Sequence, residues 1–143
     1  MLLTATVAAL IALGIETYVF TVAYPMFALI GDSEFASVHA FHANRITYSI
    51  GPALLVAAFA NVALTLDRPR DVPAWLPVAG ALAGLAILAL TAFVQIPLHA
   101  KLSASGRDLS TIARLNANEW MRALATLVQA ACDVAMVAIA LRR

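Results

Sequence analysis

The chain of 143 residues is 63% hydrophobic and 12% charged, and its mean hydropathy is +0.89. A soluble domain has about 25% charged residues, so this composition excludes an ordinary soluble protein and predicts an all-α protein of the lipid bilayer. The formal net charge of +1, without a basic stripe, gives no sign of nucleic-acid binding. The single cysteine, Cys132, excludes a disulfide within the chain.

Four apolar stretches are long enough to cross a bilayer, which takes about 20 residues per helix. They run from Leu2 to Ile30, from Ile46 to Leu66, from Val72 to Leu98 and from Leu109 to Leu141. The first contains Glu16 and has no Lys or Arg before it, so we expect a helix of the mature protein rather than a signal peptide. Short connections predict an up-down-up-down bundle of four transmembrane helices in one domain, residues 1–143.

Prolines and glycines mark the expected helix ends. Pro25 should kink or end the first helix, and the Gly-Asp-Ser sequence at 31–33 should form a turn and a helix cap. The second helix should then begin near residue 33 and bend at Gly51 and Pro52. With their polar ends included, the expected membrane helices cover about 2–30, 33–66, 72–100 and 109–141.

The two halves of the chain show a faint internal repeat. TVAYPMFA aligns with VQIPLHAK, which places Pro25 opposite Pro97, and FHANR aligns with LNANE, which places His42 opposite Asn116. The offsets are 72 and 74 residues. We therefore interpret the bundle as two repeated helical hairpins in the same orientation, a known way of building a site between repeats.

The segment EFASVHAFHANRITYS, Glu34 to Ser49, concentrates polar groups just before the second apolar run. His39 and His42 are three residues apart and Arg45 follows after another three, so all share one face of a helix. Imidazole and guanidinium groups are costly beside lipid, which predicts that this face meets other polar groups.

Helical rise of about 1.5 Å per residue predicts where those groups are. Counted from the membrane face that carries the termini, Tyr24 lies at roughly 34 Å, His42 and Asn118 at roughly 36 Å, and His99 at roughly 37 Å. The next groups are deeper: Arg45, Arg122 and Glu16 at roughly 31, 30 and 22 Å. We therefore expect all four helices to bring polar residues to one level near a membrane face, with His42 and His99 as neighbours. Solvated histidines, an interfacial anchor at Trp120 and snorkelling arginines are the structural alternative.

Ionisable residues inside the spans have two readings. Glu16 either pairs with Arg122 or Arg45 to hold the bundle together, or handles protons. Asp133, with Gln129 one turn before it, is expected to hydrogen-bond between helices, and Asn61 and Gln95 are interpreted in the same way. In the third span, Gly80 and Gly84 have the small-xxx-small spacing that lets helices approach closely.

Three histidines also suit a transition metal or haem, and His39, His42 and His99 are the candidate ligands. The HxxH spacing is weak evidence, and the HExxH motif of metalloproteases is missing from the sequence. No GxSxG elbow, P-loop or dinucleotide fingerprint is present either. A cofactor is therefore either lacking or bound by histidine.

IPLHAKLS followed by LNANEWMRAL resembles the small four-helix bacterial membrane proteins grouped with anthrone oxygenase-like proteins. YPMFALIGDSEF and HAFHANRI resemble an uncharacterised group of bacterial membrane proteins. The residues that carry the first resemblance are Pro97, Leu98, Leu102, Asn118, Trp120 and Arg122. The expected location is the bacterial inner membrane. Arg68, Arg70, Arg142 and Arg143 lie close to span ends, which favours cytoplasmic termini.

The sequence predicts binding of a lipophilic, aromatic or quinone-like molecule at the polar level. The resemblance implies an oxygenase-like oxidation without an organic cofactor, in which His42 or His99 is the base and Arg122 and Asn118 stabilise an oxyanion. The expected ligand-binding residues are Tyr24, Trp120, Arg45 and Glu16. The alternatives are the metal or haem protein and a small proton-coupled transporter using Glu16 and Asp133, whose thin pathway would call for a homo-oligomer.

Overall fold

The computed structural model describes residues 1–142, and four long helices account for most of them. The first consists of α1 (Leu2–Tyr18), the π-helical turn η1 (Val19–Ala23) and α2 (Tyr24–Met26). The second is α3 (Asp32–Leu66). The third consists of α4 (Trp75–Leu90), the π-helical turn η2 (Thr91–Gln95) and α5 (Ile96–Ser105), and the fourth is α6 (Leu109–Ala140). Each of the four is long and apolar enough to cross a membrane.

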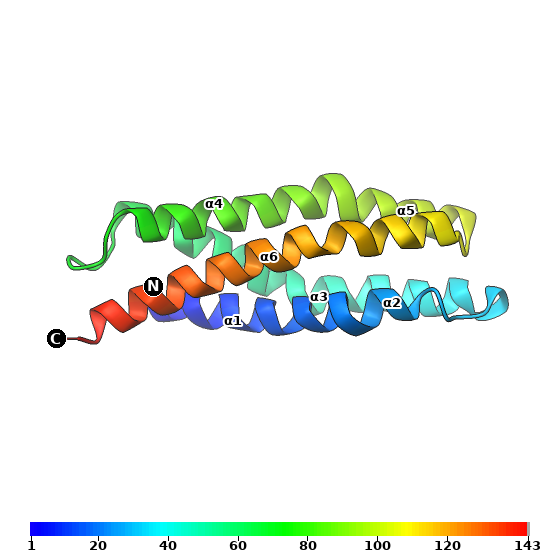
Figure 1. Cartoon of the computed structure of the whole chain (residues 1–143), viewed down its shortest axis with the longest axis horizontal. Helices are drawn as coiled ribbons and strands as arrows, with labels where there is room; N and C mark the ends of the chain where they lie inside the picture. Colours follow the sequence, from blue (N-terminus) through cyan, green and yellow to red (C-terminus); the bar gives the residue numbers. More distant parts are fainter. Residues whose placement is uncertain (143) are drawn as a thin grey trace.

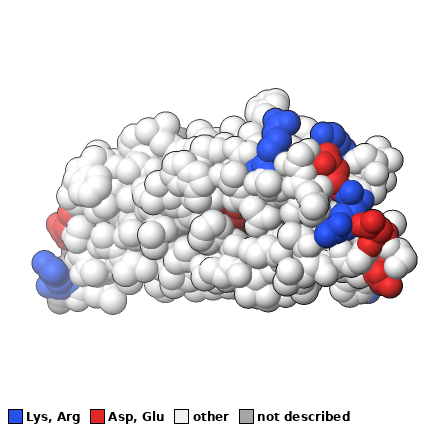
Figure 2. Space-filling model, turned by 45° about the vertical axis from the view of Figure 1, so that its right-hand side comes forward, with Lys and Arg blue, Asp and Glu red and all other residues white. Residues whose placement is uncertain are grey.

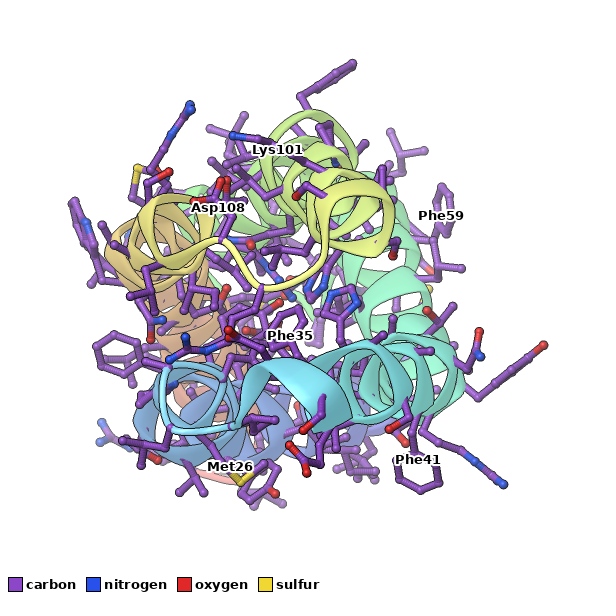
Figure 3. The ribbon with its side chains drawn as sticks, turned by 90° about the vertical axis from the view of Figure 1, so that its right-hand side faces the viewer. Met26, Phe35, Phe41, Phe59, Lys101 and Asp108 are labelled. Carbon is purple, nitrogen blue, oxygen red and sulfur yellow. The ribbon has the colours of Figure 1, made fainter. Side chains whose placement is uncertain are left out.

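The four helices form the predicted up-down-up-down bundle. Both termini lie at one end of the elongated molecule, and the α2–α3 and α5–α6 connections lie at the other (Figure 1). Viewed from that second end, the helices surround a common centre (Figure 3). Helix α1 packs against α3 and α6, and α4 packs against the same two helices. The chain is therefore a multi-pass membrane protein with a four-helix core.

Three helix ends differ from the sequence prediction. The first helix ends at Met26 and not near residue 30, because the carbonyls of Tyr24, Pro25 and Met26 accept hydrogen bonds from residues three positions ahead, at 2.9–3.2 Å. The third helix starts at Trp75 and continues to Ser105, where Gly106 ends it with a positive φ of 75°. Helix α3 continues through Pro52 without a break, as the sequence predicted, and the bend expected there stays a prediction.

The π-helical turns recur at the same offset as the sequence repeat. Pro25 follows η1 and Pro97 follows η2, each as the second residue of the next helical segment. Proline has no N–H and its ring crowds the carbonyl four residues earlier, whereas a π-helical turn widens the helix at that point. The first and third helices therefore both accommodate a proline with a π-helical turn directly before it, which agrees with two repeated hairpins.

The bundle is tightly packed in the half that carries the termini. Ala8, Ala9, Ala57 and Ala130 form one core cluster there. A Cβ at Gly84 would lie 3.0 Å from the Cα of Ala58, so only glycine lets α4 approach α3 this closely. The other half has a larger aromatic and aliphatic core: Val19, Tyr24, Phe27, Phe35, Leu98, Leu102, Ile112 and Leu115.

On the face in Figure 2, charged side chains gather near the two ends of the molecule, and the region between them is uncharged except for one small acidic patch. At the loop end, Arg107 donates to Asp32 at 3.0 Å and to the carbonyl of Ala28 at 2.9 Å, which joins the α5–α6 connection to the α2–α3 connection. Asp108 caps α6 by accepting from the backbone N–H of Ser110. Hydrogen bonds and an ion pair therefore hold the two connections at this end of the bundle together.

Candidate functional site

Three histidines from two helices meet at the loop-end half of the bundle. His39 and His42 come from α3, and His99 comes from α5. The ring centroids of His39 and His99 are 5.1 Å apart, and those of His42 and His99 are 5.9 Å apart with planes inclined by 21°. The prediction that His42 and His99 become neighbours is confirmed.

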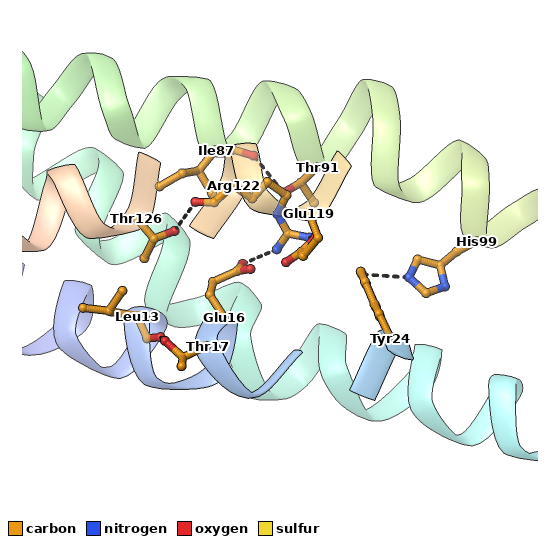
Figure 4. A network of polar contacts seen from close by, with 10 residues as sticks. All are labelled: Leu13, Glu16, Thr17, Tyr24, Ile87, Thr91, His99, Glu119, Arg122 and Thr126. Carbon is orange, nitrogen blue, oxygen red and sulfur yellow. Dashed lines mark hydrogen bonds and ion pairs between the residues drawn. The ribbon is translucent and has the colours of Figure 1, made fainter. Parts of the chain in front are cut away.

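A row of hydrogen bonds joins Tyr24, His99 and His39. The Tyr24 hydroxyl lies 3.0 Å from Nε2 of His99 (Figure 4), and Nδ1 of His99 lies 2.9 Å from Nε2 of His39. Both nitrogens of the His99 ring are therefore engaged. We refer to these three residues as the Tyr–His row. Nε2 of His42 is buried and, among residues 1–142, has no hydrogen-bond partner.

Phenyl rings enclose the histidines. Phe27 meets His42 edge-on with ring centroids 5.1 Å apart, and Phe35 stacks on His39 at 5.5 Å. Both phenylalanines are completely buried, and Phe35 points into the centre of the bundle (Figure 3). Tyr24 and His39 of the row are thus buried, His99 is partly exposed, and the structural alternative of solvated histidines does not apply to His39.

A buried ion cluster lies next to the row. Arg122 of α6 donates to Glu16 of α1 and, at 3.3 Å, to Glu119 of its own helix (Figure 4). The two carboxylates are completely buried and Arg122 is 5% exposed. The predicted pairing of Glu16 with Arg122 is confirmed.

The sequence analysis did not identify Glu119 as a site residue. It stands three residues before Arg122 in an apolar span, and this spacing places two opposite charges together on one helix face. That signal was available, because an ionisable residue within a span is by default a functional candidate.

A cavity of about 360 Å³ lies between α3 and the η2–α5 segment. Most of its wall is apolar, and its polar lining includes the buried Tyr24, Gln95 and Arg122 and the partly exposed His99. Thr47, Ile96, Ala100 and Ser103 also line it but are exposed on the side of the bundle. The cavity therefore opens on the side of the bundle, between α3 and α5, and its buried polar residues form what we call its inner end.

Gln95 is the least expected member of this site. It is the last residue of η2 and is 2% exposed, yet neither atom of its side-chain amide has a hydrogen-bond partner in the described part of the chain. The prediction that Gln95 hydrogen-bonds between helices is wrong, because η2 places it in the cavity wall. An unpaired amide buried in a membrane protein is costly and is well suited to receive a ligand.

Three predicted site residues lie elsewhere. The amide of Asn118 donates to the carbonyl of Arg114 at 2.7 Å on its own helix, and Trp120 is 53% exposed and lines a separate groove between α4 and α6. Glu119, which lies between these two residues in the sequence, and Arg122, which follows Trp120, are the side chains that face inward. Arg45 is exposed and lies over the Phe41 ring at 5.5 Å. Their heights were estimated without the rotation of each helix, and rotation turns their side chains away from the cavity.

A second polar cluster lies in the tightly packed half. The amide of Asn61 donates to Asp133 at 3.2 Å, which confirms the predicted interhelical hydrogen bond of Asp133. The two residues are 72 positions apart, the offset of the repeat. Gly80 lies against Asn61 and Gly84 lies against Gln129, so close that a Cβ on either would clash with the amide.

The geometry lends no support to a metal site. Among residues 1–142, no group of three or more His, Cys, Asp or Glu side chains is arranged to hold a metal ion. A metal bound to His99 would have to displace Tyr24 or His39 from one of its nitrogens. The candidate ligands His39, His42 and His99 are instead held by hydrogen bonds and ring contacts.

The arrangement can bind a molecule with an apolar body and one polar end. Comparison with protein-family models, with curated proteins and with solved structures finds no match for the chain.

Proposed function

We propose that the protein binds a lipophilic small molecule, with a ring carrying oxygen, in the cavity between α3 and α5. The observation that carries this proposal is the apolar cavity whose inner end presents the unpaired Gln95 amide beside Tyr24, His99 and Arg122. Ligand sites are typically cavities of about 300–1,000 Å³ with a mainly apolar wall and a few convergent polar groups. The volume of about 360 Å³ lies within that range.

The route into the cavity supports a ligand that partitions into lipid. The exposed rim of the cavity includes Ile96 and Ala100, and most of its wall is apolar, with Ile50 and Leu54 among the buried lining residues. A charged or strongly hydrated ligand would lose its solvation on this path. A hydrophobic ring keeps its apolar surroundings and gains hydrogen bonds at the end.

Narrowing the cavity mouth tests the proposal. Ala100 lines the cavity, whereas Ala104 is exposed one turn further along α5 and does not line it. Binding of a decyl-substituted 1,4-naphthoquinone to detergent-solubilised protein is measured by calorimetry. We expect Ala100→Phe to weaken binding at least about tenfold, which is about 1.4 kcal/mol, and Ala104→Phe to leave it unchanged.

Two outcomes would contradict the proposal. The wild-type protein could fail to bind the naphthoquinone, or both phenylalanine variants could bind it as the wild type does. Circular dichroism of each variant shows whether the helices are intact, which separates a blocked cavity from an unfolded protein.

An oxygenase-like reaction is a second candidate function, favoured by the presence of His99 and Arg122 at the same end of the cavity. A base removes a proton from an activated ring CH₂, the carbanion adds O₂ to give a peroxide anion, the anion takes the proton back, and the resulting hydroperoxide loses water to leave a carbonyl. His99 is the nearest base and Arg122 would stabilise the oxyanion. Oxygen consumption with a ring ketone carrying an acidic CH₂ group, lost in His99→Gln, tests this candidate.

The orientation of the bundle in the membrane and the homo-oligomeric state of the protein stay predictions. The two termini share one end of the bundle (Figure 1), and we propose that this end faces the cytoplasm of a bacterial inner membrane. A reporter fused to the C-terminus, active only on one side of the membrane, tests the orientation.

A further inference from the structure

We propose that the Tyr–His row is a reversible donor–acceptor switch, which lets one cavity bind both a quinone and the corresponding quinol. The inference rests on the proposed function and names the class of ligand for it. Its basis is that Tyr24 and His99 both line the cavity, while His39, which does not line it, is hydrogen-bonded to the far side of the His99 ring.

A neutral imidazole has one N–H group and one nitrogen lone pair. Because both nitrogens of His99 are hydrogen-bonded, the row has two self-consistent arrangements. In the first, Tyr24 donates to Nε2 of His99, and Nδ1–H of His99 donates to Nε2 of His39. In the second, Nε2–H of His39 donates to His99, and Nε2–H of His99 donates to the oxygen of Tyr24. The heavy-atom separations of 2.9 and 3.0 Å suit both.

The two arrangements give the Tyr24 hydroxyl opposite characters towards the cavity. In the first arrangement the hydroxyl hydrogen of Tyr24 is used within the row, so only lone pairs of its oxygen are left, and these accept a hydrogen bond from a ligand. In the second arrangement the Tyr24 oxygen accepts from His99, so the hydroxyl hydrogen is free to be donated to a ligand. The number of protons on the three residues is the same in both.

The surroundings leave this choice open to the ligand. Phe27, Phe35 and the His42 ring pack around the two imidazoles of the row, and these contacts are ring contacts that fix neither tautomer. Gln95 can hydrogen-bond to either form of the ligand without a rearrangement, because its unpaired amide offers both a donor and an acceptor.

The ligand class follows from these two features. A quinone carbonyl only accepts, so it selects the second arrangement. A quinol hydroxyl donates, so it binds the first arrangement, in which the Tyr24 oxygen accepts. A site meant for only one of these forms would gain nothing from a row that can reverse.

The tautomer of His39 is the direct readout. In the quinone complex His39 should carry its proton on Nε2, and in the quinol complex on Nδ1. The ¹⁵N signals of selectively labelled histidines distinguish the two. The probes are the decyl-naphthoquinone and the same compound reduced by dithionite under anaerobic conditions, bound to the full chain in lipid nanodiscs.

Tyr24→Phe disconnects the row from the ligand, and Tyr18→Phe is the matched control because Tyr18 is exposed on α1. We expect the His39 tautomer to differ between the two complexes in the wild type and in Tyr18→Phe. In Tyr24→Phe it should be the same in both, and each probe should bind about fivefold more weakly for the loss of one hydrogen bond.

Failure of this inference differs from failure of the proposed function. If both probes bind the wild type and Ala100→Phe blocks them, but the His39 tautomer is identical in the two complexes, the switch is refuted and the binding site stands. If neither probe binds, the site and the switch are refuted together.

Discussion

Replacing Arg122 by Met should lower the free energy of unfolding by ~3–5 kcal/mol, which is the usual cost of removing one partner from a buried ion pair. Arg122 joins Glu16 and Glu119, and both carboxyl groups are completely buried. Without the guanidinium, two carboxyl groups would be left in the membrane interior with neither a cation nor water. The loss is larger than that of a surface ion pair, which is worth ~0–1 kcal/mol.

A matched triple variant separates the contribution of the ion pairs from the cost of burying an unpaired charge. In Glu16→Gln, Glu119→Gln, Arg122→Met the charges are removed together, so no unpaired ion remains. Since replacing a whole buried ion cluster is often neutral or stabilising, we expect the triple variant to unfold within ~1 kcal/mol of the wild type. Equilibrium unfolding in mixed detergent micelles at increasing SDS fraction measures both variants. A loss below ~1 kcal/mol in Arg122→Met would show that the cluster does not hold the helices as the structure indicates.

Two further predictions concern packing and capping. Gly84→Ala should lower the free energy of unfolding by ~1–3 kcal/mol, because the new Cβ would lie 3.0 Å from the Cα of Ala58. Gly14→Ala is the control and should not destabilise the protein, because a Cβ at Gly14 meets nothing within 4 Å. The same unfolding assay compares the two variants. Asp108→Ala should loosen the first turn of α6, seen as faster amide hydrogen exchange there. Hydrogen bonds from Thr111 and Ser110 hold the pKa of the Asp108 carboxyl well below its ordinary value of 3.8, so the difference from wild type should be fully present above that pH and shrink only as the pH falls further below it.

The positions along the membrane normal were predictable, because they depend on local quantities. Span length follows from the run of apolar residues, and the height of a side chain follows from the constant rise of the helix. For this reason His42 and His99 were expected to be neighbours, and the structure places their rings 5.9 Å apart.

The rotation of each helix was much harder to predict. Lipid tails and the bundle interior are both apolar, so Leu, Val and Ala occupy both faces and the usual pattern of inside and outside residues is weak. Asn118 and Trp120 were expected at the site, but they flank the buried Glu119 and face away from the cavity. Only the inward polar residues of α6 carried rotational information, since Glu119, Arg122, Thr126, Gln129 and Asp133 recur at spacings of three and four and are all buried.

The sequence by itself determined an all-α membrane protein with four spans, a repeat of 72 residues and polar groups brought to one level of the bundle. Each of these depends on composition or on the geometry of a single helix. Only the tertiary structure decided that Gln95 faces a cavity, that Tyr24, His99 and His39 form one row, and that Glu119 completes the cluster at Arg122. Those relations depend on how four helices of similar apolar character rotate against each other, and that is set by packing between them.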